Sequence, residues 1–204
     1  MKRSRIFLFF GVVVLIWLGY IKYFIDENKP DGEPLLREEK ALDNLESKKF
    51  EELTIPYLRE RDYGGVLGEK KKYQDKSNYV SYLTNYSSEG LKINGLLTIP
   101  KGEVPVGGWP AVVFVHGYIP PTLYKTTEKY LEYVDYLAKS GLVVFKIDLR
   151  GHGESEGEPG GAYYSGDYVV DVLNAYNALQ ESGFVNVNRI GLWGHSMGGN
   201  VVFR

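Results

Sequence analysis

The chain has 204 residues, a formal net charge of −2, 44% hydrophobic residues and no cysteine. This length allows one globular domain with an appendage, and the near-neutral charge gives no basis for expecting nucleic-acid binding. The lack of cysteine excludes disulfides and thiolate metal sites within these residues, and three histidines are too few to predict a metal centre, so we expect no cofactor.

The first 25 residues have the pattern of a membrane signal anchor. Basic residues at positions 2, 3 and 5 precede an uncharged run over 6–21. As a helix this run would span roughly 24 Å, or about 30 Å if it extends to Ile25. Aromatic residues, and not the small residues of a cleavage site, end the run. We predict an uncleaved transmembrane anchor over 1–25, with a cleaved signal peptide or a buried helix as alternatives. Because the basic cluster comes first, we expect the N-terminus in the cytoplasm and the rest outside the membrane.

Residues 26–78 are expected to form a charged stalk and a lead-in segment. The stretch 26–52 is densely charged with scattered leucines, which favours a solvated stalk over an amphipathic helix. From Thr54 to Lys76 the composition suggests a segment that docks on the following domain. We assign no chemistry to it, and the lysines at 70–72 are interpreted as a solvated face.

From Tyr79 the sequence alternates as strands do. The runs 79–86 and 91–99, joined through Ser88-Glu-Gly, predict an antiparallel hairpin. The mostly apolar runs 111–115, 142–147 and 190–193 predict buried parallel strands. Helical spacing of apolar residues over 130–138, with Thr126 or Thr127 as cap, and over 169–179 predicts two helices between them. The predicted fold class for 79–204 is therefore α/β, with the hairpin leading into a parallel sheet flanked by helices.

The last predicted strand runs directly into Gly194-His-Ser-Met-Gly198, the pattern of a nucleophile elbow. A sharp strand-to-helix turn exposes a serine hydroxyl so that a base can activate it. Gly194 and Gly198 would keep the strand and the helix from colliding, and the Met197 amide would point to where an oxyanion forms. We therefore predict Ser196 as the nucleophile.

The same five-residue pattern occurs a second time, at Gly153-Glu-Ser-Glu-Gly157. Ser155 lies between two glutamates whose charges would oppose an oxyanion, and a Pro/Gly loop follows it where a helix should begin. We interpret this second match as an ordinary turn.

Three loops at the carboxyl ends of the predicted parallel strands are expected to meet in one crevice. They are His116-Gly-Tyr118, Asp148-Leu-Arg-Gly-His152-Gly and Gly194-His-Ser196. In open α/β sheets ligands bind at this edge, so we expect the chemistry there.

These motifs, in this order, resemble the α/β-hydrolase superfamily over 79–204. Val115-His-Gly is similar to its oxyanion loop, and 194–199 is similar to its nucleophile elbow. The hairpin around 91–97 and the lead-in 188–194 look most like the catalytic domains of the prolyl oligopeptidase family and the related dienelactone-hydrolase and esterase groups. A monoglyceride-lipase-like group is similar through Arg150-Gly-His-Gly-x-Ser. The β-propeller of prolyl oligopeptidases has no room between the anchor and the hairpin.

The resemblance implies roles for individual residues. It makes Ser196 the nucleophile, gives the oxyanion hole the backbone amides of Met197 and Tyr118, and makes His116, Gly117 and His195 supports of the loop and the elbow. The Tyr118 side chain has three possible roles: to line the acyl pocket, to assist through its hydroxyl, or to pack under the prolines that follow.

The acid and base partners are not expected within the chain. In this superfamily they follow the serine in the order Asp or Glu, then His, but only eight residues follow Ser196. We do not expect His116, His152 or His195 to be the base, so we interpret the chain as an N-terminal fragment with its Asp and His beyond residue 204.

The N-terminal pattern predicts a membrane-anchored, extracytoplasmic protein, and the resemblance implies a serine hydrolase, first of all a prolyl-oligopeptidase-like serine peptidase that works through an acyl-enzyme on Ser196. A carboxylesterase or monoacylglycerol-lipase-like hydrolase is the alternative, and a non-catalytic α/β-hydrolase-like binding module is a third possibility. The expected partners are a small peptide or ester substrate and the membrane, without nucleic acid and with the oligomeric state open.

Overall fold

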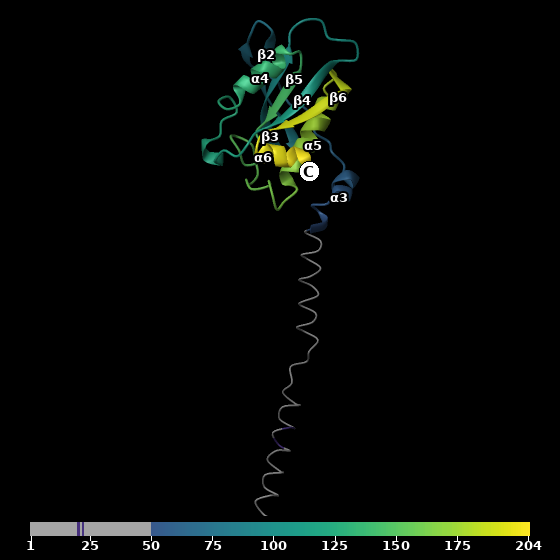
Figure 1. Cartoon of the computed structure of the whole chain (residues 1–204), viewed down its shortest axis with the longest axis vertical. Coiled ribbons are helices and arrows are strands. Elements are labelled where there is room, and N and C mark those ends of the chain that lie inside the picture. Colours follow the sequence, from purple (N-terminus) through teal and green to yellow (C-terminus); the bar gives the residue numbers. More distant parts are fainter. Residues whose placement is uncertain (1–19, 21, 23–49) are drawn as a thin grey trace, which may run out of the picture. The chain divides into compact units, whose positions relative to one another are not determined.

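The computed structural model describes residues 20, 22 and 50–204, and the chain divides into two units, Met1–Lys49 and Phe50–Arg204. The predicted anchor over 1–25 and the stalk up to residue 49 lie outside the described residues, apart from residues 20 and 22. Among the residues that are described, no helix is both long and apolar enough to cross a membrane. Figure 1 shows the second unit as a sheet with helices packed on it.

A six-stranded mixed sheet forms the centre of the second unit, in the order β1-β2-β3-β5-β4-β6. The pairs β1–β2, β2–β3 and β3–β5 are antiparallel, while β5, β4 and β6 run parallel to one another. The strands are β1 (Lys71–Asp75), β2 (Tyr79–Ser88), β3 (Leu91–Pro100), β4 (Trp109–Val115), β5 (Val143–Ile147) and β6 (Val185–Gly194). The helices are α3 (Ile55–Glu60), α4 (Leu131–Lys139), α5 (Asp167–Gln180) and α6 (Met197–Phe203), with a 3-10 turn η1 (Pro121–Leu123).

Helices cover both faces of β4 and β5, which explains why these two strands are mostly apolar, whereas much of the edge strand β6 is exposed. Alternate side chains of β4 serve opposite faces: Val113 and Val115 belong to the larger core beneath α5 and α6, whereas Phe114 packs in a smaller core with Val134 of α4. The prediction of a buried parallel strand followed by a helix is therefore confirmed for 111–115 and for 142–147. It is wrong for 190–193, because β6 lies at the edge of the sheet and most of its residues are exposed or only half-buried.

The predicted hairpin is also confirmed as β2 and β3, which pair in register from Tyr79–Pro100 to Ser88–Leu91. Its two-residue turn, Glu89-Gly90, has positive φ at both positions, 52° and 80°. Turns of this hand match the twist of the strands they join, which explains the tight connection.

The structure corrects two predictions. The lead-in segment contains an edge strand, β1, that was not predicted, because all five of its residues are exposed and carry no apolar alternation. Neither Thr126 nor Thr127 caps the following helix, since α4 begins only at Leu131 and has no side-chain cap. The Thr126 hydroxyl donates instead to the Asp148 carboxylate at 2.5 Å, because a buried carboxylate needs donors.

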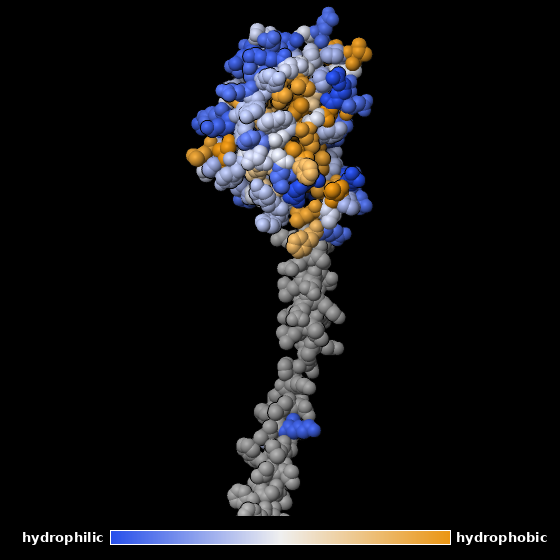
Figure 2. All heavy atoms as spheres, in the orientation of Figure 1, coloured by the Kyte–Doolittle hydropathy of each residue, from blue (hydrophilic) through white to orange (hydrophobic). Residues whose placement is uncertain are grey.

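Hydrophobic side chains are exposed beside the edge strand β6. Figure 2 shows them across the region where β6 and α6 lie in Figure 1. Leu192 of β6 and Phe203 of α6 are among the exposed apolar residues, and residues of α3, α5, β6 and α6 line a hollow of about 320 Å³. These exposed residues extend the apolar surface of the larger core to this edge of the sheet.

Candidate active site

Ser196 lies at the turn between β6 and α6 in a strained backbone conformation. Its φ of 52° and ψ of −115° are rare for a residue with a side chain and cost on the order of 1–3 kcal/mol. The residue is exposed, and its hydroxyl has no hydrogen-bond partner among residues 50–204. The turn therefore presents a free hydroxyl to solvent.

Glycines on either side make this turn possible. A Cβ on Gly194 would overlap the Gly198 carbonyl, and one on Gly198 would overlap the Val115 carbonyl at the end of β4. The elbow is also tied to that strand, because the His195 N–H donates to the Val115 carbonyl at 3.2 Å. The close approach of strand, helix and neighbouring strand thus requires glycine at both positions.

The two amides expected in an oxyanion hole come from the elbow and from the loop after β4. Within 50–204 neither the Met197 N–H nor the Tyr118 N–H has a hydrogen-bond acceptor. Gly194 pairs with Val115 across β6 and β4, so the elbow and the loop leave the sheet side by side. The Tyr118 side chain is 69% exposed, which does not fit packing under the prolines that follow it.

The three histidines are all held away from the Ser196 hydroxyl by other contacts. His116 is buried between the Gly117 and Asp148 carbonyls, at 2.8 and 2.9 Å, and burial lowers its pKa to about 4. The ring is therefore neutral at pH 7 and donates to only one of these carbonyls, bracing the two loops. His152 is buried with Nδ1 3.2 Å from the Arg150 carbonyl, and His195 Nδ1 lies 3.1 Å from the Tyr130 hydroxyl. No described histidine is hydrogen-bonded to Ser196.

Ser155, in the other Gly-x-Ser-x-Gly turn, is a structural tether. Its Oγ accepts a hydrogen bond from the Asn94 N–H of β3 at 2.9 Å, and its own N–H donates to the His152 carbonyl at 3.0 Å. The hydroxyl oxygen is thus engaged in holding the loop after β5 against β3.

Beneath the loops lies a buried polar cluster that sequence reasoning missed. The Tyr124 hydroxyl donates to Asp148 Oδ1 at 2.8 Å and accepts from Lys146 Nζ at 2.9 Å. Burial raises the pKa of Asp148 to about 6 and lowers that of Lys146 to about 8. The Tyr124 hydroxyl thus joins the Lys146 ammonium and the Asp148 carboxyl in one buried hydrogen-bonded chain. A lysine within the apolar run 142–147 was the one sequence signal for it.

A second missed network joins the lead-in to the domain. The Arg150 guanidinium donates to Asp171 of α5 at 2.8 Å and to Glu89 in the hairpin turn at 2.9 Å. Glu89 in turn pairs with Arg61, just after α3. Arg150, Asp171 and Glu89 therefore fix the hairpin and the loop after β5 on α5, and we assign them no chemistry.

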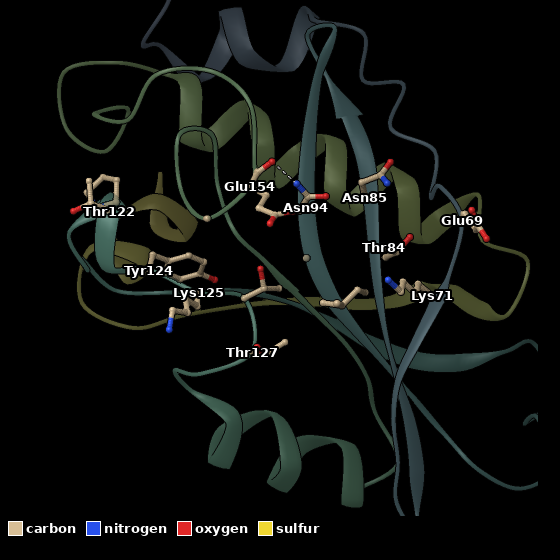
Figure 3. A pocket seen from close by; sticks show the side chains of 15 residues that line it. Glu69, Lys71, Thr84, Asn85, Asn94, Thr122, Tyr124, Lys125, Thr127 and Glu154 are labelled. Atoms are coloured by element: carbon tan, nitrogen blue, oxygen red, sulfur yellow. Dashed lines mark hydrogen bonds between the residues drawn. The ribbon is translucent and has the colours of Figure 1, made fainter.

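A broad groove elsewhere on the domain does not contain Ser196. This groove of about 770 Å³ lies between the loop 121–127 and strands β1 to β3, with Gly153 and Glu154 along it. Figure 3 shows Asn94 donating to the Glu154 carbonyl on one side and Lys71 and Glu69 on the other. Its lining mixes polar and charged side chains with Leu83 and Pro121 and contains no serine, so we place the chemistry at the elbow. Among residues 50–204, no group of three His, Asp or Glu side chains is placed to hold a metal.

Comparison with known proteins places this geometry in a known fold. Residues 110–204 match the family described as "Serine aminopeptidase, S33". An acetyl xylan esterase from Paenibacillus sp. R4 superposes with a TM-score of 0.55 at 23% identity, over 70% of this chain and 49% of that one. The mixed sheet and these matches establish the predicted α/β-hydrolase fold. They do not show that the chain belongs to the prolyl oligopeptidase family within that fold.

Curated relatives match in sequence over part of their length. The "Uncharacterized peptidase YtmA" of Bacillus subtilis is 28% identical over 135 residues, which are 66% of this chain and 49% of that protein. The "Thiohydrolase aneE" of Aspergillus aculeatus is 30% identical over 132 residues, 64% of this chain and 36% of that protein. The chain therefore spans between about a third and a half of the curated relatives that it matches.

Proposed function

We propose that this α/β-hydrolase domain belongs to a serine hydrolase that cleaves carboxylic esters, thioesters or amides through an acyl-enzyme on Ser196. The observation that carries the proposal is the Ser196 backbone, with φ of 52° and a hydroxyl that has no partner within residues 50–204. Strain on a reactive residue is retained where the surrounding structure holds it in place, and here Gly194 and Gly198 allow that turn.

In the proposed mechanism the Ser196 hydroxyl attacks the substrate carbonyl and passes its proton to a base. The carbonyl oxygen becomes an oxyanion that the Met197 and Tyr118 amides stabilise; both amides lack an acceptor within 50–204. Collapse of the tetrahedral intermediate expels the alcohol, thiol or amine, which takes up the proton from the base. Water then hydrolyses the acyl-enzyme by the same steps in reverse.

We propose that the base is a histidine outside residues 50–204, oriented by a carboxylate that is also outside them. The support is that His116 and His152 are buried and engaged with backbone carbonyls, and that His195 is hydrogen-bonded to Tyr130. In this fold the partners follow the nucleophile in the sequence, which agrees with that proposal.

Two substrate classes compete, each with its own support. A serine peptidase, in its narrower form prolyl-oligopeptidase-like, is favoured by the serine aminopeptidase match and by the name of the B. subtilis relative. An ester or thioester hydrolase is favoured by the thiohydrolase at 30% identity. The chemistry separates them, because an amide nitrogen must be protonated as it leaves, whereas an alkoxide or thiolate leaves with less help.

We also propose that the N-terminal segment anchors the enzyme in the membrane with the hydrolase domain outside the cytoplasm. The support is the uncharged run over 6–21 behind three basic residues. Protease added to intact spheroplasts should release the domain. Full protection of the domain, or a mature N-terminus near residue 26, would refute the proposal.

The nucleophile is tested by labelling the full-length protein with a fluorophosphonate probe. We expect the wild type and Ser155→Ala to be labelled and Ser196→Ala not to be, with turnover in Ser196→Ala lower by about 10⁴-fold or more. Labelling that persists in Ser196→Ala would overturn the assignment, and a wild type that is neither labelled nor active would favour the non-catalytic binding module.

The substrate class is decided by comparing kcat/KM on aminoacyl p-nitroanilides with that on p-nitrophenyl esters of the same acyl groups, with Ser196→Ala as the blank. Cleavage of anilides or peptides at rates comparable with the esters would support the peptidase. Ester turnover without detectable anilide cleavage would support the esterase.

A further inference from the structure

Tyr130 occupies a backbone conformation that a tyrosine rarely adopts. It is the residue just before α4, with φ of 64° and ψ of 14°, in the left-handed region where glycine or asparagine is usual. Its half-buried ring packs against Phe114 of β4, at 5.6 Å between ring centroids, and against His195 at 5.5 Å. A bulky side chain in such a position points to a specific contact that its backbone must reach.

The Tyr130 hydroxyl bridges the two segments that carry the proposed oxyanion donors. It accepts a hydrogen bond from the Gly117 N–H at 3.0 Å and lies 3.1 Å from His195 Nδ1. A Cβ on Gly117 would lie 2.6 Å from this hydroxyl and 2.9 Å from His195 Nδ1. Only a glycine therefore lets the loop, the phenol and the imidazole meet at one point.

The Tyr130 hydroxyl can hydrogen-bond both the Gly117 N–H and His195 Nδ1 in either tautomer of His195. The Gly117 N–H donates to the phenol oxygen, which leaves the phenol proton free to donate to Nδ1 when that nitrogen carries no proton. When Nδ1 is protonated it donates to the second lone pair of the phenol oxygen. In both cases the Gly117 amide is engaged, so the next amide along the loop, that of Tyr118, is the one left free.

We propose that Tyr130 is a positioning residue that sets the distance between the Tyr118 and Met197 amides, and this inference rests on the proposed function. Gly117 precedes Tyr118 directly, and His195 lies two residues before Met197, so the bridge fixes one donor relative to the other. Charge develops on the carbonyl oxygen only in the transition state, so loss of the bridge weakens transition-state binding more than substrate binding.

The test is Tyr130→Phe in the full-length protein, with Tyr133→Phe as the matched control. Tyr133 lies in the same aromatic cluster, against Phe114 and Trp193, but its hydroxyl has no hydrogen bond within residues 50–204. Removing an oxyanion donor costs about 10²–10³-fold in kcat, so displacing one should cost about 10–100-fold. We expect that loss for Tyr130→Phe, with KM within about threefold and an unchanged melting temperature, and no kinetic change for Tyr133→Phe.

A second readout separates positioning from general damage to the fold. A peptidyl or aryl boronic acid forms a tetrahedral adduct with the serine, so its affinity should fall in Tyr130→Phe by about the same factor as kcat/KM. His195→Ala should show a similar loss, and the double variant little more than either single variant, because all three break one bridge.

The outcomes distinguish this inference from the function on which it rests. An active wild type whose kcat is unchanged by Tyr130→Phe overturns the inference alone, as does a loss shared equally by Tyr133→Phe or one that appears only in KM. A wild type without turnover and without labelling at Ser196 overturns the proposed function, and this inference with it.

Discussion

The turns 153–157 and 194–198 share the pattern Gly-x-Ser-x-Gly, yet their positive φ angles fall on different residues. In the first turn the positive φ angles belong to glycines, 59° at Gly153 and 86° at Gly157, and the Ser155 hydroxyl holds β3. In the second the positive φ belongs to the serine itself, and its hydroxyl has no partner among residues 50–204.

This difference teaches how the two matches can be told apart. Glycine adopts left-handed conformations at no steric cost, so the first turn is a relaxed connection. A serine in such a conformation is strained by about 1–3 kcal/mol, and the strain persists because β6, α6 and β4 fix both sides of it. The five-residue pattern alone does not indicate which residue carries the strain. The strand that precedes the pattern and the helix that follows it indicate that the serine carries it.

The largest expected effect comes from adding one methyl group to the elbow. Gly194→Ala should lower the free energy of unfolding by about 3 kcal/mol or more, because the new Cβ would overlap the Gly198 carbonyl, which cannot move without shifting α6. Gly191→Ala, three residues earlier in β6, is the control, since its Cβ would meet nothing within 4 Å. Urea unfolding followed by tryptophan fluorescence measures both. Equal stabilities would mean that the elbow is not the tight turn described here.

Much of this comparison could be predicted from the sequence. The runs 111–115, 142–147 and 190–193 are mostly apolar, and the elbow follows the last of them directly, so the pattern of apolar residues predicts the order of elements around Ser196. The linkage of Asp148 to Lys146 through Tyr124 could not be predicted, because Tyr124 comes from the loop after β4 and only the folded protein brings it to the end of β5. Strand β1 was missed because a fully exposed edge strand carries no apolar signal.

The next largest expected effect is a pH dependence of the stability, which comes from a carboxyl buried beneath the turn 153–157. Asp148 lies under Gly153, and burial raises its pKa from 3.8 to about 6 although Lys146, Thr126 and Tyr124 oppose the shift. Between these two values the folded state holds a proton that the unfolded state has lost, so the carboxyl makes the protein less stable as pH rises. The shift corresponds to about 3 kcal/mol at most.

Asp148→Asn removes the titrating carboxyl, so comparing the stability of the wild type with that of this variant measures its contribution. The stability of the wild type relative to the variant should fall by up to about 3 kcal/mol between pH 4 and pH 6.5. Urea unfolding at a series of pH values follows the difference, with Glu158→Gln, on the exposed loop beyond the first turn, as the control. A difference that does not change with pH would mean that Asp148 titrates in the folded protein as it does in the unfolded chain.

Replacing each of the two serines by glycine should change the free energy of unfolding in opposite directions. Ser196→Gly relieves the strain at φ of 52°, and after the entropy that glycine adds to the unfolded chain we expect a net gain of about 1 kcal/mol together with loss of activity. Ser155→Gly loses its hydrogen bond without relieving strain, so we expect a loss of about 1–2 kcal/mol. Thermal unfolding of the two variants checks the signs. A destabilised Ser196→Gly would show that the serine conformation stores no strain.

The smallest expected effect comes from removing the Ser155 hydrogen bond that holds the turn 153–157 against β3. Ser155→Ala removes the acceptor of the Asn94 N–H, so the free energy of unfolding should fall by about 1 kcal/mol. Ser87→Ala, on the exposed side of β2 and without a side-chain hydrogen bond, should change it by less than about 0.5 kcal/mol. Turnover per folded molecule should be unchanged in both variants, because neither hydroxyl contacts the elbow. Reduced turnover in Ser155→Ala, measured at a temperature where the variant is fully folded, would mean that the first turn takes part in the chemistry and that the two turns are less distinct than their backbones suggest.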